Sequence, residues 1–362
     1  AVDGAGNAYV TGSTLSDQTT FPVVSGPDLT YNGTNGNNNT DGFVAKVNAA
    51  GAALVYAGYI GGRASDHGYD IAVDGSGNAY VTGYTTSPQT SFPVLGGPDV
   101  TFNGGANIGD AFVAKVNATG TALVYAGYIG GAGEDIGHSI AVDRAGSAYI
   151  TGDVGFDSQT TFPVLVGPDL TFNGGGEVFV AKVNAAGTAL VYSGYVGGRR
   201  YESAGGIAVD GAGNAYVTGT TDSPESTFPV LVGPDLTFNS SVEQGYRDAF
   251  VAKVNAAGTA LVYAGYIGGW ISDHGSDVAV DGSGNAYVTG WTDSPESSFP
   301  VLVGPDLTHS DPYTGNDAFV AKVNATGTAL VYAGYIGGEY TDSGTGIAVD
   351  GAGNAYVTGS TL

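Results

Sequence analysis

A phrase of twelve residues recurs along this chain every 67 to 71 residues, and this repetition limits how the chain can fold. The phrase is Ala-Val-Asp-Gly-x-Gly-Asn-Ala-Tyr-Val-Thr-Gly, and a second phrase, Phe-Val-Ala-Lys-Val-Asn followed by Gly-x-Ala-Leu-Val-Tyr, lies between its copies. Such self-similarity indicates one supersecondary unit that packs on the next. We therefore expect a single repeat domain over residues 1–362, with repeats at approximately 1–69, 70–138, 139–205, 206–276 and 277–345 and a half repeat at 346–362.

Each repeat predicts four strands and no helix, because no segment has helical periodicity. In the second repeat the expected strands are residues 70–74, 79–84, 111–117 and 122–129, joined in pairs by short turns that contain glycine. The last strand carries apolar or small residues on both faces, which predicts cover on both sides. Four-stranded antiparallel sheets that cover one another in tandem are the blades of a β-propeller. The fold class is therefore all-β, with five full repeats and a half repeat.

The same glycine recurs in the middle of the last strand of every full repeat. We expect neighbouring blades to approach closely at this position, because a glycine within a strand often marks a close backbone approach. The residues are Gly58, Gly127, Gly194, Gly265 and Gly334.

The motifs together resemble a known family. In order along each repeat they are Asp-x-Gly-x-x-Ile-Ala-Val-Asp-x-x-Gly-Asn-Ala-Tyr-Val-Thr-Gly, then Phe-Pro, Asp-Ala-Phe-Val-Ala-Lys-Val-Asn and Leu-Val-Tyr-x-x-Tyr-Ile-Gly-Gly. This pattern is similar to the bacterial SBBP repeat, which is named for a seven-bladed β-propeller. The resemblance implies a propeller fold in an extracellular or cell-surface protein, and it implies no common catalytic activity. This chain departs from the name because it has five full repeats and a half repeat.

The charge balance excludes several classes of partner. Ten Lys and Arg residues face 34 Asp and Glu residues, for a net charge of −24, which would repel nucleic acid and anionic membrane surfaces. No apolar run approaches the ~20 residues that span a membrane, so we expect no membrane insertion. The chain opens at Ala1 within a repeat, and any targeting segment is expected to have been removed or to lie outside it. The absence of cysteine excludes disulfides and thiolate metal sites.

A carboxylate recurs just before the first expected strand of most repeats. Asp66, Asp135, Asp273 and Asp342, with Glu202 in a diverged repeat, would lie near one mouth of a propeller tunnel. Such a ring could hold Ca²⁺, which prefers carboxylate oxygens, or the side chains could cap backbone amides of loops. Both interpretations stay open, and we expect no other cofactor. The turn from Asp281 to Asn285 favours an Asx turn over a metal site, because the remaining ligands of a calcium loop do not follow it.

Five lysines occupy one repeat position: Lys46, Lys115, Lys182, Lys253 and Lys322. An acidic residue precedes each of them by five positions, and an odd separation places the two side chains on opposite faces of one strand. We therefore expect a structural ion pair with a partner in an adjacent strand or blade. The alternative is a ring of ammonium groups that binds an anion.

The remaining candidates are aromatic and imidazole side chains. Of 23 tyrosines, 16 fall on three strand positions, which predicts a buried role. Trp270 and Trp291 occur in one repeat only and are the best candidates for a local binding surface. The histidines, which are His67, His138, His274 and His309, are scattered and are expected to be ordinary loop residues.

Residues 1–15 and 348–362 are the same string, AVDGAGNAYVTGSTL. Only one of these two hairpins could complete the blade whose outer strands lie within residues 43–60. The other would begin a further blade, hang free, or complete a blade of another molecule. A free hairpin would expose Ala355, Tyr356 and Val357 together with unpaired backbone edges, which favours self-association.

Near-identical blades supply the same group repeatedly, whereas one reaction centre needs distinct groups. The leading interpretation is therefore a non-catalytic extracellular structural or adhesive module, not an enzyme, that self-associates through its duplicated hairpin into a filament or a surface layer. The alternative is a lectin-like propeller that binds glycans. The third is a hydrolase or lyase, which would need an asymmetric cluster of perturbed carboxylates.

Overall fold

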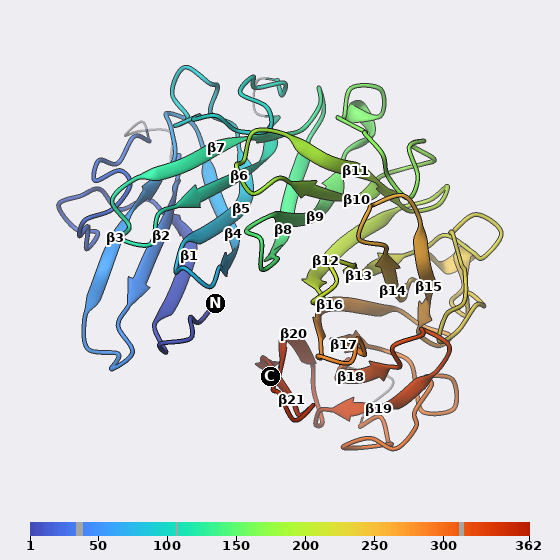
Figure 1. The fold of residues 1–362 in the computed structure, drawn as a ribbon. Coiled ribbons are helices and arrows are strands. Elements are labelled where there is room, and N and C mark those ends of the chain that lie inside the picture. Colours follow the sequence, from blue (N-terminus) through green and yellow to red (C-terminus); the bar gives the residue numbers. More distant parts are fainter. Residues whose placement is uncertain (34–38, 106–107, 311–314) are drawn as a thin grey trace. The chain divides into compact units, whose positions relative to one another are not determined.

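The chain folds into a series of small antiparallel sheets in a computed structural model (Figure 1), which describes residues 1–33, 39–105, 108–310 and 315–362. The first sheet contains β1 (Ala8–Thr14), β2 (Asp41–Val47) and β3 (Leu54–Ile60). Four sheets of four strands follow: β4 (Asp66–Val73), β5 (Ala79–Thr85), β6 (Asp110–Val116) and β7 (Leu123–Ile129); β8 (Asp135–Val142), β9 (Ala148–Val154), β10 (Glu177–Val183) and β11 (Leu190–Val196); β12 (Glu202–Val209), β13 (Ala215–Thr221), β14 (Asp248–Val254) and β15 (Leu261–Ile267); β16 (Asp273–Val280), β17 (Ala286–Thr292), β18 (Asp317–Val323) and β19 (Leu330–Ile336). A two-stranded sheet contains β20 (Asp342–Val349) and β21 (Ala355–Thr361).

Each four-stranded sheet is a propeller blade in which consecutive strands are hydrogen-bonded neighbours, which confirms the predicted all-β fold. We number the strands of a blade from first to fourth, so that β4, β5, β6 and β7 are the first to the fourth strand of one blade. The loop at residues 241–246 contains a short 3-10 helix, Val242–Gln244. Another short 3-10 helix spans Phe156–Ser158. Within the described residues, no helix has the length and apolarity needed to cross a membrane.

The first strand of each blade is longer than predicted. It begins at Asp66 in β4, whereas the sequence predicted a start at Asp70, because a register shift between Gly68 and Asp70 lets the strand continue its pairing with β5. Alternation of side chains does not reveal such a bulge, since the bulge interrupts the period of two. The recurring carboxylates therefore lie in the first strands and do not precede them.

The hairpin between the first and second strands is the predicted Asx turn. Asp281 Oδ1 accepts hydrogen bonds from the backbone amides of Ser283 and Asn285, at 2.9 and 3.0 Å. Gly284 has a φ of 84°, a conformation that glycine adopts without strain. The interpretation of Asp281 as a turn residue is thus confirmed.

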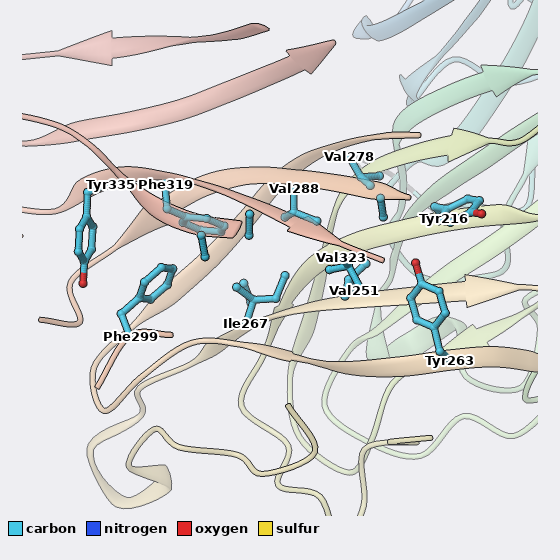
Figure 2. Close-up of a cluster of buried hydrophobic side chains, with 14 residues drawn as sticks. Tyr216, Val251, Tyr263, Ile267, Val278, Val288, Phe299, Phe319, Val323 and Tyr335 are labelled. Atoms are coloured by element: carbon cyan, nitrogen blue, oxygen red, sulfur yellow. The ribbon is translucent and has the colours of Figure 1, made fainter. Parts of the chain in front are cut away.

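The chain divides into two compact units, residues 1–165 with 181–193 and residues 166–180 with 194–362. Within each unit the first strand of one blade lies beside that of the next, as β4 lies beside β8 and β12 beside β16. Apolar side chains fill the space between successive blades. Figure 2 shows such a cluster, in which Tyr216, Val251, Ile267, Val288 and Phe319 are all completely buried.

The tyrosines at the three strand positions belong to this core, as predicted. Tyr80, Tyr125 and Tyr128 are all completely buried. Tyr80 packs edge-on against Tyr125, and Tyr128 lies beside Phe92 and Phe102.

The recurring glycine of the fourth strand has a different role from the one predicted. A Cβ on Gly265 would lie 2.5 Å from the carbonyl oxygen of Asp235 and 2.8 Å from Gly233, both in the Gly-Pro-Asp segment of the same blade. This segment runs along the fourth strand, where the amide of Tyr266 donates to the carbonyl of Asp235 at 2.9 Å. The prediction of a blade-to-blade approach was wrong, because the segment after Phe-Pro returns to cover the free edge of its own sheet.

Candidate functional site

Two acidic residues that are 25 positions apart meet at every step from one blade to the next. One is the first residue of a third strand, and the other is the first residue of the first strand of the following blade. The backbone amide of the second residue donates to the carbonyl of the residue that precedes the first, for example Asp273 to Arg247 at 2.7 Å. We call these carboxyl pairs; they are Asp41 and Asp66, Asp110 and Asp135, Glu177 and Glu202, Asp248 and Asp273, and Asp317 and Asp342.

The backbone amide four residues earlier donates a hydrogen bond to the side chain of the second member of each pair. Asp66 Oδ2 accepts from the backbone amide of Gly62 at 2.6 Å and from Ser87 Oγ at 2.9 Å, while Thr85 donates to Oδ1. Asp273 has the same arrangement with Gly269, Thr292 and Ser294. This geometry matches the predicted capping of loop amides.

The first member of each pair has fewer partners. Asp248 Oδ2 accepts from the backbone amide of Asn239 at 3.0 Å, and Asp110 Oδ2 accepts from that of Asn103 at 2.9 Å. Among the described residues, no hydrogen-bond donor reaches the other oxygen of these carboxyl groups, although that oxygen is buried. The oxygens concerned are Oδ1 of Asp41, Asp110, Asp248 and Asp317 and Oε2 of Glu177.

Burial dominates the electrostatics of these pairs, because a charged carboxylate loses its hydration there. Desolvation raises the pKa of Asp248 to about 7; hydrogen bonds from Ser240 and Asn239 oppose this rise, and the negative charge of Asp235 adds to it. Desolvation and then the charge of Asp248 raise the pKa of Asp273 well above its usual range. The pKa of Glu177 rises to about 8, also mainly through desolvation, and the charge of Glu202 contributes.

Asp66, Asp135, Asp273 and Asp342 were the predicted calcium ligands. The structure places each of them in a carboxyl pair, and their side chains accept hydrogen bonds from backbone amides of Gly62, Gly131, Gly269 and Gly338. Over the described part of the chain, no three His, Cys, Asp or Glu side chains form a group that could hold a metal ion. The calcium hypothesis stays a prediction.

Sequence reasoning identified both members of each pair but did not bring them together. It treated Asp41 and its equivalents only as charges near the lysines. The constant separation of 25 residues was the available signal, and the Gly-Gly sequence between the members, such as Gly268 and Gly269, marks where both carboxyl groups meet the backbone.

The five repeated lysines form the predicted structural ion pairs. Each partner is the aspartate of the turn between the first and second strands. Lys253 Nζ lies 3.6 Å from Asp210 Oδ2, and it also lies over the ring of Tyr216 at 4.6 Å from the centroid. The other four have equivalent partners: Lys46 pairs with Asp3, Lys115 with Asp74, Lys182 with Asp143 and Lys322 with Asp281.

The tryptophans and histidines differ in their environments. Trp270 is 61% exposed, whereas Trp291 stacks on His274 with ring centroids 5.6 Å apart. His67, His138 and His274 lie in first strands, so the prediction of loop positions was wrong for these three and right only for His309. The cause is the longer first strand, which takes in residues that the sequence placed in a loop.

The terminal hairpin of β20 and β21 differs from all other blades. Tyr356 is 60% exposed, whereas the equivalent Tyr9 is 2% exposed, and Ala355 and Val357 are half-buried. Beside the hairpin lies a groove of about 520 Å³, lined by residues of β18, β19 and β21 and by Val303, Gly304 and Pro305. Ile336 in this groove is 41% exposed, whereas the equivalent Ile267 is fully buried.

Comparison with known families identifies the repeat. The model of the SBBP beta-propeller repeat matches residues 55–88, 124–153, 191–224, 262–295 and 331–362. Each match runs from a fourth strand through the first and second strands of the next blade, and so contains the second member of a carboxyl pair. Among curated proteins, no sequence matches this chain.

Solved structures are similar at low identity. A protein of unknown function from Dyadobacter fermentans has 11% identity and a TM-score of 0.49, over 99% of this chain and 91% of its own. The hydrazine synthase of Kuenenia stuttgartiensis has 13% identity and a TM-score of 0.44, over 88% and 70%. A gluconolactonase from Xanthomonas campestris has 12% identity and a TM-score of 0.40, over 89% and 79%.

Proposed function

Because this chain belongs to the SBBP family of beta-propeller repeats, we propose that it is a non-catalytic structural or adhesive module of the cell exterior that associates through its terminal hairpin. The repeated polar groups support a scaffold. In each blade that contains the repeated lysine, this lysine contacts the aspartate and the tyrosine ring at equivalent positions of the repeat. A reaction centre requires different groups in different roles, and these contacts are the same from blade to blade.

The observation that carries the association is the pairing of β21. Residues of β21 repeat those of β1 one for one, and β1 pairs with β2 from Ala8 opposite Val47 to Thr14 opposite Asp41. In the described chain β21 pairs with β20 and leaves its other edge without a strand. A β2-type strand would therefore fit this edge in the same register, with Ala355 opposite Val47, once β21 has taken the place that the identical β1 holds beside β2 in the second copy.

The charge of Asp350 also favours a β2 strand beside β21. Asp350 accepts hydrogen bonds from Asn354 and Tyr356, as the equivalent Asp3 does from Asn7 and Tyr9. Asp3 also has Lys46 at 3.3 Å, whereas no lysine reaches Asp350 within the described residues. Lys46 of a second copy, on a β2 strand that has exchanged β1 and its Asp3 for β21 and Asp350, would supply this missing cation.

The groove beside β21 supports an occupant with an apolar face. In other blades the tyrosine equivalent to Tyr332 is completely buried, for instance Tyr263, whose ring meets Gly327 of the following blade. Tyr332 and Ile336 face the groove instead. The β2–β3 hairpin of a second copy would bury them, and the outer strands of a following repeat in a longer chain would do the same.

Substitution at the exposed edge tests the association. We expect residues 1–362 to form oligomers that grow with concentration, and Tyr356→Ala to weaken them at least tenfold, because Tyr356 would lie under Lys46 of the other copy. Tyr340→Ala is the matched control, since Tyr340 is 63% exposed and has no place in the groove. Sedimentation velocity over a range of concentrations gives the answer. A monomer at all concentrations, or equal weakening by both variants, would contradict the proposal.

Cross-linking tests whether β21 pairs with β2 of a second copy or with β2 of its own chain. A carbodiimide can join Lys46 to Asp350 only where they form the proposed ion pair. In a mixture of ¹⁴N and ¹⁵N copies, we expect mass spectrometry to find mixed-isotope cross-links between these residues. Cross-links within single copies only would mean that the hairpin pairs inside its own chain.

Trp270 favours a second candidate function, the binding of glycans. Its 61% exposed side chain, on the loop after β15, is an aromatic platform of the kind that sugars stack on. A glycan panel tests this candidate, with binding expected to be lost in Trp270→Ala and kept in Tyr340→Ala. The hydrolase or lyase alternative has no comparable support, because the carboxyl groups with raised pKa recur in each blade and are buried.

A further inference from the structure

The carboxyl pair of Asp248 and Asp273 has an arrangement that neither scaffold nor adhesion explains. Both residues are completely buried, and both lie in the same compact unit. A Cβ on Gly268 would lie 2.9 Å from Asp248 Oδ1 and 2.7 Å from Asp273 Oδ2, so the two oxygens face the same point. Among the described residues, which include the whole loop before β14, no donor forms a hydrogen bond of standard geometry with Asp248 Oδ1, although Ser240 of that loop lies close enough to lower the pKa of Asp248.

Among the described residues, no positive charge compensates this pair. The titratable groups that face it are Asp235 from the Gly-Pro-Asp segment, Tyr266 from β15 and Tyr335 from β19. The neighbouring Arg247 places its guanidinium over the ring of Tyr201, at 4.6 Å. Two ionised carboxylates would thus share a buried space with a further carboxylate nearby, which is costly in a medium of low dielectric constant.

A calcium ion does not fit this pair, because too few oxygen atoms are available to bind it. Calcium takes six to eight oxygen ligands. Three hydrogen bonds already occupy the oxygens of Asp273, and the Asn239 amide occupies Oδ2 of Asp248. Only Asp248 Oδ1 is free, which is one ligand and not a coordination shell.

We propose that the Asp248 and Asp273 pair binds one proton from solvent and holds it between the two carboxyl groups. The proton forms an O–H bond at Asp248 Oδ1, which changes this oxygen from an acceptor without a donor into a donor toward Asp273 Oδ2. One proton also lowers the charge of the pair from −2 to −1. The two groups then titrate as one unit.

The same pattern recurs in a second pair. Glu177 and Glu202 show it with longer side chains: Oε2 of Glu177 has no described donor, and Glu202 Oε2 would lie 2.7 Å from a Cβ on Gly197. The Glu177 and Glu202 pair is thus a second proton-binding site of the same kind. This inference is independent of the proposed function, since it concerns groups inside the blades and not the terminal hairpin.

Proton binding makes stability depend on pH with a definite sign. A carboxyl group whose pKa is higher in the folded than in the unfolded state contributes stability that is fully present below the unfolded value, near 4, and is lost as pH rises through the folded value. Burial raises the pKa of Asp248 to about 7. We therefore expect the unfolding equilibrium constant to increase up to about tenfold per pH unit for each protonated pair as the pH rises above 4.

Asp248→Asn tests the shared proton, because the amide donates permanently where the carboxyl group must first be protonated. Urea unfolding of residues 1–362 should show a midpoint that falls between pH 5 and pH 8, and the pH dependence of the variant should correspond to about one bound proton fewer. At pH 8 the urea midpoint of the variant should be higher than that of the wild type. Glu243→Gln is the control, since Glu243 is exposed in the loop that precedes β14. An unchanged pH dependence in Asp248→Asn would overturn the proposal.

Infrared spectroscopy tests the native protein without a variant. We expect the carbonyl stretch of a protonated carboxylic acid at pH 6, where exposed carboxyl groups are ionised, and its loss on unfolding. A spectrum with ionised carboxylates only would overturn the proposal. So would stabilisation at pH 8 by Ca²⁺ that chelation reverses and that Asp248→Asn abolishes, because the pair would then bind the metal and not a proton.

Discussion

The hydroxyl group of Tyr216 lies 3.2 Å from the carbonyl oxygen of Gly284, in the first turn of the following blade. It also lies 3.0 Å from Asp210 Oδ2 in its own blade. Tyr80 bonds Gly146 in the same way, and Tyr287 bonds Gly353. One tyrosine hydroxyl thus joins the charged turn of one blade to the turn of the next, which explains why the Tyr of the first phrase accompanies its Asp and Gly.

Tyr216→Phe should reduce the free energy of unfolding by about 1–2 kcal/mol, because it removes a buried hydrogen bond to a charged group. Tyr356→Phe, measured at a concentration at which the protein is monomeric, is the matched control, since Tyr356 donates to Asp350 at 3.1 Å but is exposed in the single chain and contacts no following turn. We expect a change below about 0.5 kcal/mol there. Equal effects in urea denaturation would mean that the bond to the next blade contributes nothing.

Gly268→Ala should destabilise the protein by about 1–3 kcal/mol, because the added methyl group meets both oxygens of a carboxyl pair in a closely packed space. Gly282→Ala is the control: no atom lies within 4 Å of a Cβ at Gly282, and its φ is not positive. Thermal unfolding of the two variants compares them directly. A control variant as unstable as Gly268→Ala would assign the effect to backbone freedom and not to the carboxyl groups.

Much of the fold follows from the sequence, because the repeat, the alternation along 123–129 and the turns at Asp74 and Asp281 all point to short antiparallel strands. The extended first strand could not be read in this way, since the bulge after Gly68 breaks the alternation that defines a strand. The position of the Gly-Pro-Asp segment on the edge of its own sheet depends on tertiary packing, and Gly265 alone does not distinguish this contact from one between blades.

The candidate site was predictable only in part. The sequence located each carboxylate, and the lysine partners followed from the parity of their spacing. The meeting of Asp248 with Asp273 was not predictable, because the residues belong to different blades and only the packing of one sheet on the next brings their side chains to the same point.

Val303→Gly should raise the free energy of unfolding by about 1 kcal/mol. Val303 has a φ of 34°, which is unfavourable for a β-branched residue, and its side chain is 74% exposed, so little packing is lost. The second repeat already has glycine at the equivalent position, Gly96, with a φ of 55°. Val331→Gly in β19 is the control and should destabilise, because Val331 has ordinary strand geometry. Equal destabilisation of both variants in urea would show that Val303 is not strained.

Acid should destabilise the protein through the turn aspartates. Their contribution to stability decreases as the pH falls, whereas that of the carboxyl pairs decreases as the pH rises. At Asp281 partial burial opposes ionisation, but the hydrogen bonds from Asn285, Ser283 and Tyr287 outweigh it and hold the pKa at about 2. A carboxyl group with a lowered folded pKa contributes stability above its unfolded value, near 4, and loses it as the pH falls through the folded value. We therefore expect the urea midpoint to be highest near pH 4 to 5 and to fall toward pH 2. Asp281→Asn should weaken the fall on the acid side and leave the loss above pH 5 unchanged, because the carboxyl pairs are intact. A variant that altered only the loss above pH 5 would reverse this assignment.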